Sequence, residues 1–161
     1  MITALKFLYT LSLSLWVGSI FFLAMIAAPS IFKVLQREQA GDVVSEIFPK
    51  YYMLAYVCGT VLLVSSIALI YLDNHLSNLL NAVKIGAIVV MIGLAVYAGE
   101  INRPQAHEVR TQMRAVGEGG PEYTNLHNKF RGLHRTSAIT NSAIFILGIA
   151  LLLLSAYTNR E

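Results

Sequence analysis

Five side chains that could do chemistry lie inside long apolar segments of this chain or at the edge of one: Tyr9, Trp16, Lys84, His134 and Asn141. A strongly polar or ionisable group within a membrane-spanning segment is costly to bury, so it is a candidate for function by default. Lys84 is the charge that the third apolar segment retains. We therefore take these five as candidate cofactor-contacting residues, and the sequence assigns no catalytic residue.

Tyr9, Ser12, Trp16 and Ser19 recur at spacings of three and four residues, which places them on one face of a helix. In one interpretation this face is a packing seam, where the serines and Gly18 let neighbouring helices approach closely. In the other it is one wall of a cavity, with the two aromatic rings as stacking surfaces for a flat ligand. The spacing is compatible with both.

Asn81 and Lys84 share a face of the third segment, and Gly86 and Gly93 follow as expected close-packing positions. A lysine near the end of a span can extend its stem to the interface, which is the first interpretation. In the second, Lys84 meets Tyr9 between helices. Its ammonium group would then pair with a ligand carboxylate, such as a haem propionate, or assist proton transfer.

His134 and Asn141 lie on one face of the fourth segment, together with Ser137. An asparagine about 10 Å inside the membrane surface must find hydrogen-bond partners on other helices or on a ligand. His134 is flanked by Arg131 and Arg135, a setting that suits a phosphate-facing interface as well as a metal or haem site. Both readings of this face stay open.

No metal site is predicted. His127 and His134 are seven residues apart, which is about 10 Å along a helix and too far for one ion. Cys58 is the only cysteine, so a thiolate cluster and an internal disulfide are excluded.

These residues need long helices to position them, and the charge distribution provides four. Uncharged runs fill more than half of the 161 residues, with 56% hydrophobic and 13% charged residues in the whole chain. Since a helix needs about 20 apolar residues to cross a bilayer, we expect an all-α integral-membrane four-helix bundle that forms a single membrane domain over residues 1–161. The predicted spans are residues 4–28, 50–72, 78–100 and 135–157.

Basic residues predict the orientation. Nine of the twelve lysines and arginines lie in the two longer connections, residues 30–50 and 100–135. By the positive-inside rule these connections face the cytoplasm and both termini lie outside the cell (inner) membrane. The lipid bilayer thus accounts for the basic character, and no nucleic-acid partner is predicted.

Short amphipathic elements are expected beside the spans. Pro29 favours a helix break, after which residues 30–35 and 42–49, divided by Gly41, would lie as two pieces in the headgroup region. Residues 117–121 form a glycine- and proline-rich hinge. Around that hinge, residues 107–116 and an extension of the fourth helix by about three turns would form a cytoplasmic helical hairpin between spans 3 and 4.

Four short blocks resemble a known family. Residues 15–22 (Leu-Trp-Val-Gly-Ser-Ile-Phe-Phe), 28–32, 48–52 and 130–137, followed by Asn141, resemble the transmembrane-protein-205-like family, a domain of unknown function. The resemblance covers nearly the whole chain. It implies a four-helix membrane protein and supplies no reaction.

A more distant similarity is to the copper-resistance-D proteins and to the bacterial four-helix protoporphyrinogen oxidases. Lys6, Trp16 and Lys84 fit the oxidase arrangement, whereas Tyr9 stands where those oxidases have a histidine. The resemblance implies haem as a possible cofactor. Tyrosinate can ligate ferric haem, but the lost histidine argues against a simple transfer of the activity.

Three functions compete. The first is a non-catalytic accessory protein or small subunit that packs in a larger membrane complex, or a homo-oligomer, and it is favoured because convergent reactive groups are scarce. The second is a haem- or porphyrin-binding redox protein built on the candidate residues. The third is export of a metal ion or small solute, for which four helices are few. Of these three, the non-catalytic membrane protein is favoured, and whether the protein is an enzyme stays open.

Overall fold

The fold is entirely helical in the part of the chain that the structure, a computed structural model, describes: residues 1–72, 78–117 and 119–158. The elements in chain order are α1 (Ile2–Phe21), the π-helical turn η1 (Phe22–Ala27), α2 (Ala28–Val34), α3 (Arg37–Leu72), α4 (Asn78–Val96), the π-helical turn η2 (Tyr97–Asn102), α5 (Arg103–Val116) and α6 (Pro121–Thr158). Within the described residues, four continuous helices are long and apolar enough to cross a membrane. This confirms the predicted all-α four-helix membrane bundle.

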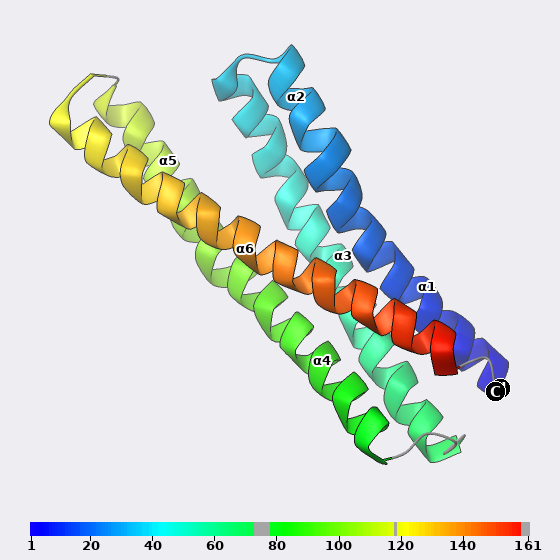
Figure 1. The fold of residues 1–161 in the computed structure, drawn as a ribbon. Coiled ribbons are helices and arrows are strands. Elements are labelled where there is room, and N and C mark those ends of the chain that lie inside the picture. The colour runs from blue at the N-terminus through cyan, green and yellow to red at the C-terminus, as the bar shows by residue number, and fades with distance from the viewer. Residues whose placement is uncertain (73–77, 118, 159–161) are drawn as a thin grey trace.

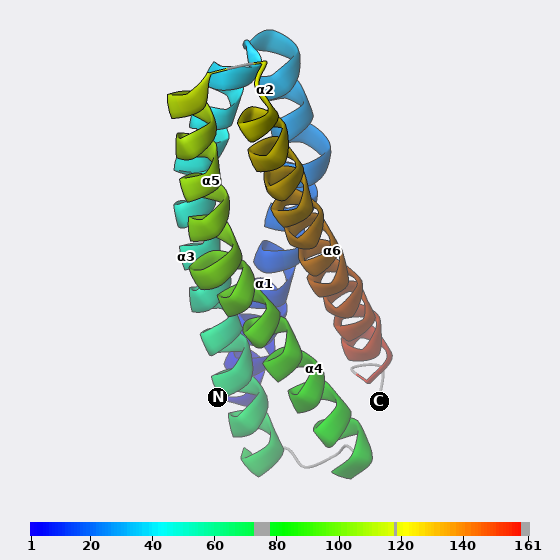
Figure 2. The same ribbon diagram turned by 90° about the vertical axis from the view of Figure 1, so that its left-hand side faces the viewer.

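The four long helices form an antiparallel bundle (Figure 1). α1 packs against α3 and α6, and α4 packs against the same two helices on the other side. The start of α1 and the end of α6 lie at the same end of the bundle, which we call the terminal end. α2 and the turn between α5 and α6 lie at the opposite end, the loop end (Figure 2).

Large apolar side chains from all four helices fill the centre of the bundle. The largest side chains with almost no exposure are Leu13, Trp16, Leu62, Ile88, Met91 and Ile144. Glycines let the helices approach them. A Cβ on Gly59 would lie 3.2 Å from Cζ3 of Trp16, and one on Gly148 would collide with Cγ2 of Val17.

The glycines that the sequence singled out as close-packing positions are not the ones that pack. Gly18, Gly86 and Gly93 are exposed, and a Cβ added at any of them would meet nothing within 4 Å. For packing within this chain the prediction was wrong, because helical spacing relates residues to one another without showing which face turns inward. The neighbouring helices settle that orientation.

The predicted break at Pro29 is also wrong, because the helix passes through it by way of η1. Proline lacks a backbone donor, and its ring collides with the carbonyl four residues earlier in an α-helix. The wider π turn, with a bond from the Ala28 N–H to the Leu23 carbonyl, changes that register just before the proline. The first helix thus runs unbroken from Ile2 to Val34.

The continuous helix Leu79–Val116 passes through Pro104 in the same way. η2 ends two residues before this proline, as η1 does before Pro29. In the π pattern the Arg103 N–H bonds to the Ala98 carbonyl. The same pattern would pair the Gly99 carbonyl with the nitrogen of Pro104, which carries no hydrogen and cannot donate. Nε of Arg103 donates to the Gly99 carbonyl instead, at 3.2 Å.

Residues 42–49 do not form a separate interfacial piece. They belong to α3, which contains both Gly41 and Pro49. Gly41 does not divide two elements, because its missing side chain makes room for the guanidinium of Arg110. This contact comes from a residue far along the chain, so local composition could not predict it.

The helical hairpin at the loop end is confirmed. α5 and the first part of α6 pack together, joined by a turn where Gly117 and Gly119 have φ values of 73° and 105°. Glycine adopts this left-handed backbone without the cost that a side chain would add. Nδ2 of Asn102 donates to the Leu133 carbonyl at 3.1 Å and fixes the base of the hairpin.

Candidate functional site

Trp16 and Tyr9 lie inside the bundle rather than beside an opening. Trp16 has no exposed surface and Tyr9 is 6% exposed. Among the described residues, the hydroxyl of Tyr9, Nε1 of Trp16 and Oγ of Ser155 have no hydrogen-bond partner. Ser12 is buried on the same face, so the stripe turns towards other helices as its spacing indicates, and closely packed side chains surround it.

Lys84 lies towards the terminal end and contacts α6. Its Nζ donates to Oγ1 of Thr158 at 3.2 Å, and this hydroxyl also bonds to the Leu154 carbonyl at 3.0 Å. The described contacts of Lys84 therefore connect α4 to the end of α6. They do not show the predicted meeting with Tyr9.

Asn141 links α6 to α3 across the bundle. Its Oδ1 accepts a hydrogen bond from the Tyr51 hydroxyl at 2.9 Å, and its Nδ2 donates to the Ser137 carbonyl at 3.0 Å. Both ends of the amide are thus satisfied within the protein, as buried polar groups require. This arrangement matches the interpretation in which the asparagine fixes helix packing.

An aromatic ladder runs along α3 next to this bond. Phe48, Tyr52 and Tyr56 stack in sequence with ring centroids 6.1 and 6.4 Å apart. The Tyr56 hydroxyl donates to Oε1 of Glu100 at 2.9 Å. A Cβ on Gly99 would collide with that hydroxyl and with the ring of Tyr52. These three residues are not among the predicted site residues. Their spacing of four residues could have indicated that the rings share one face of a helix.

A charged cluster lies at the loop end, between α5 and the start of α3. Arg114 forms ion pairs with Asp42 at 2.6 Å and Glu38 at 3.1 Å, and Arg110 pairs with Asp42 at 3.1 Å. Nη1 of Arg110 also donates to Oγ of Ser45 at 2.9 Å. The hydrogen bond from Arg114, assisted by the positive charges, holds the pKa of Asp42 below its usual range.

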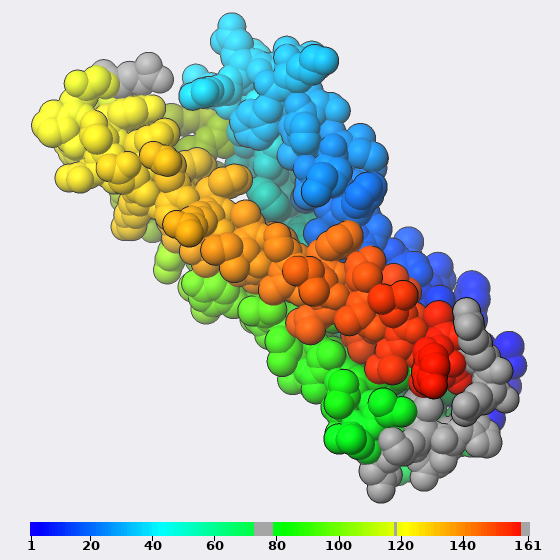
Figure 3. Space-filling model, viewed as in Figure 1, coloured from blue at the N-terminus to red at the C-terminus, as the bar shows by residue number. Residues whose placement is uncertain are grey.

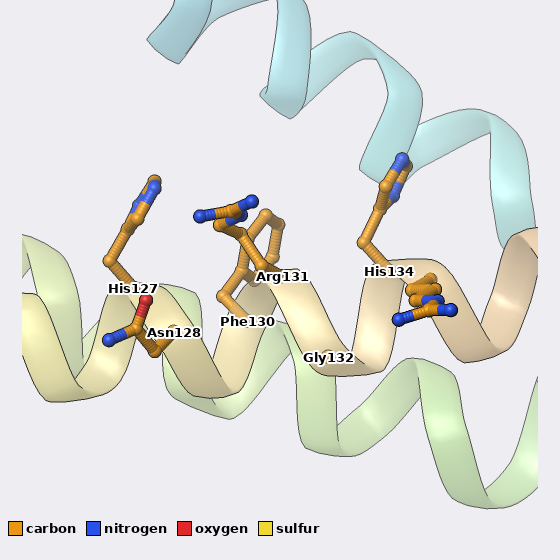
Figure 4. Close-up of a pocket in the computed structure, with 7 residues that line it drawn as sticks. His127, Asn128, Phe130, Arg131, Gly132 and His134 are labelled. Carbon is orange, nitrogen blue, oxygen red and sulfur yellow. The ribbon is translucent and has the colours of Figure 1, made fainter.

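A second basic group lies on α6, where the surface is hollowed between the two halves of the loop end (Figure 3). We call this open pocket of about 450 Å³ the α6 groove. It is lined by His127, Asn128, Phe130, Arg131, Gly132, His134 and Arg135. The side chains of His127, Arg131 and His134 point the same way from the helix, towards the N-terminal half of the fold (Figure 4).

The described residues contain no group of three or more histidine, cysteine or acidic side chains able to hold a metal ion. Cys58 is a free, buried thiol. His127 stacks on Tyr123 with ring centroids 6.0 Å apart. The structure therefore offers His127 and His134 as groove-lining groups on one helix rather than as parts of a multidentate site.

Of the five predicted site residues, only His134 lines the described pocket. Trp16 and Tyr9 are in the core, Asn141 pairs with α3, Lys84 bonds to α6 near the terminal end, and His134 lines the groove at the loop end. A porphyrin pocket formed by all five would need them around one cavity. This arrangement provides helix-packing contacts and one basic groove.

Comparisons with known proteins give a family without an assigned function. A 45-residue segment is 44% identical to an uncharacterized protein of Aquifex aeolicus (strain VF5), and the alignment covers 28% of this chain and 34% of that protein. No solved structure is significantly similar. The family model described as "Domain of unknown function (DUF4149)" matches residues 11–115. This chain, an integral membrane protein with four apolar helices, belongs to that family.

Proposed function

We propose that this protein is a non-catalytic accessory subunit that packs, through the outer face of α4, against another helix of a larger membrane complex. The dispersal of the candidate residues supports this proposal, because catalysis needs a nucleophile, base or electrophile gathered around one cavity. The observation that carries it is the pair of unused glycines on α4.

Gly86 and Gly93 are seven residues apart, two turns of an α-helix, so they share a face. Neither has a neighbouring atom within 4 Å of a built Cβ, and the adjacent Val89 and Val90 are about half exposed. Within membranes, small residues are enriched where two helix backbones approach closely. Within the bundle, Gly59, Gly99 and Gly148 lie at such close approaches. On α4, the two glycines lie on the outer face.

The proposed placement of this subunit follows from its charges. The loop end carries the paired and unpaired arginines of α5 and α6, and by the positive-inside rule it would face the cytoplasm of a cell with this protein in its inner membrane. Both chain ends would then lie outside. The partner helix would be another membrane protein or a second copy of the chain.

Replacing both α4 glycines by leucine tests the proposal. We expect Gly86→Leu/Gly93→Leu to fold, because nothing in the bundle opposes the added side chains. Its co-purification with the partner, measured by quantitative mass spectrometry after mild solubilisation from native membranes, should fall at least about tenfold, since close helix approach is blocked.

Ala150→Leu on the exposed face of α6 is the control, since it places a side chain of the same final size elsewhere on the apolar surface. It should leave co-purification unchanged. If the double variant retains every stoichiometric partner, or if the wild-type protein is monodisperse and without partners, the proposal fails. Loss of self-association alone would assign the face to a homo-oligomer.

A further inference from the structure

The loop end carries two arginine pairs in opposite surroundings. Arg110 and Arg114 are neutralised by Asp42 and Glu38. Neither Arg131 nor Arg135 has an ion pair or a side-chain hydrogen bond within the described ranges 1–72, 78–117 and 119–158. Asp42 and Glu38 are therefore used on α5, whereas the charge of the α6 pair is not neutralised by any described carboxylate.

Helical spacing gathers the basic groups of α6 into one hollow. His127, Arg131 and His134 follow one another at intervals of four and three residues, and their side chains point the same way in Figure 4. Arg135 completes the lining, and half-buried Phe130 adds an apolar surface. The groove thus combines two guanidinium groups, two imidazoles and an aromatic ring, and carboxylates are absent from this lining.

The groove also lies at a defined depth. Arg135 directly precedes the uncharged segment of α6, which runs to the end of that helix. Basic residues at this position, just outside a span, lie at the level of lipid headgroups. An anion held here would be reached equally from the membrane surface and from the adjoining water.

We propose that the α6 groove is a binding site for a phosphate group, held by Arg131 and Arg135 and by an N–H group of the adjacent His134. Guanidinium presents its donors in a planar fork that matches phosphate oxygens, and the resulting charge-assisted bonds are stronger than neutral ones. The phosphate belongs either to an anionic lipid headgroup or to a soluble anion. This site is independent of the α4 face.

The test uses the full-length protein and a double variant, Arg131→Gln/Arg135→Gln. The matched control is Lys33→Gln/Arg37→Gln, which removes the same charge from exposed positions at the same end but outside the groove. Each protein is placed in nanodiscs of equal phosphatidylglycerol and phosphatidylcholine, and retained lipid is quantified by native mass spectrometry. In a second arm, thermal unfolding of delipidated protein in mild detergent is compared in millimolar inorganic phosphate and in chloride of equal ionic strength.

If the groove binds a lipid phosphate, wild type and control should retain phosphatidylglycerol in preference to phosphatidylcholine. The groove variant should retain at least about tenfold less phosphatidylglycerol, because the charge-assisted bonds are lost. For a soluble phosphate, only the second arm responds, with a raised unfolding midpoint in wild type and control and none in the groove variant. The proposal is overturned if the groove variant behaves like wild type in both arms. It is also overturned if both double variants lose binding equally, since general surface charge then suffices.

Unfolding midpoints without any ligand guard against a folding defect. The substituted arginines are exposed and have no described partners, so the groove variant should unfold at the same midpoint as wild type. A folded variant that loses phosphate binding isolates the side-chain contribution.

Discussion

At the residue scale, a single missing methyl group decides where these helices touch. Gly148 lies where Val17 of α1 crosses α6, and a Cβ there would collide with Cγ2 of that valine. Valine is branched at Cβ and holds a restricted rotamer, so it cannot swing aside freely. Gly93, also within a helix, faces open space. The two glycines thus have the same backbone state and opposite surroundings.

We expect Gly148→Ala to lower the unfolding midpoint in detergent, because overpacking costs about 1–3 kcal/mol. Gly93→Ala is the control and should be neutral or slightly stabilising, since alanine favours a helix by roughly 1 kcal/mol over glycine. Thermal unfolding followed by circular dichroism measures both. Equal midpoints for the two variants would contradict the packing seen at Gly148.

At the element scale, the ion pairs of Asp42 join α5 to the start of α3. Asp42 accepts from Arg114 and pairs with Arg110, and these bonds hold its pKa below the usual range. A carboxyl group whose pKa is lower in the folded protein stabilises the fold above its unfolded pKa. That stabilisation disappears as the pH falls through the folded pKa. The hairpin should therefore loosen from α3 in acid.

The substitution Asp42→Asn removes this acid-sensitive contribution. We expect it to lower the unfolding midpoint relative to wild type at neutral pH, with the difference shrinking as the pH falls below about 4, the ordinary range of an aspartate. Glu46→Gln, on the same helix and without an ion pair in the described part of the chain, is the control and should show a smaller effect. A difference that does not depend on pH would assign the effect to packing rather than charge.

At the scale of the whole molecule, one end of the bundle carries the charges and the other carries the chain ends. α5 and the first part of α6 extend the loop end and carry many charged side chains. The terminal end is mainly apolar. Positively charged connections resist transfer across a membrane, so we expect the loop end to stay in the cytoplasm.

Cysteine labelling tests this orientation. In a Cys58→Ala background, Thr3→Cys should react with a membrane-impermeant maleimide on intact cells, and Asn125→Cys only after permeabilisation. Both positions are exposed at opposite ends of the bundle. The reverse pattern would place the loop end outside and invert the topology proposed above.

Local patterns predicted much of this molecule because they depend on contacts close in sequence. The apolar runs predicted four helices, the spacing of Tyr9, Ser12 and Trp16 predicted a buried stripe, and the glycines at 117–120 predicted the turn of the hairpin. The bilayer limits of residues 4–28, 50–72, 78–100 and 135–157 each fall within one of those helices and stay predictions.

The tertiary structure decided which of the polar residues meet. Tyr51 donates a hydrogen bond to Asn141, 90 residues away in the sequence. Lys84 donates to Thr158, and the guanidinium of Arg110 occupies the space beside Gly41. No local rule reports such pairs, because they depend on how four helices rotate about their axes. The sequence by itself therefore determined a four-helix membrane protein with a basic end. Only the packing, which sets those rotations, placed the candidate residues, turned two glycines of α4 outward and left the arginines of the α6 groove without an acid partner among the described residues.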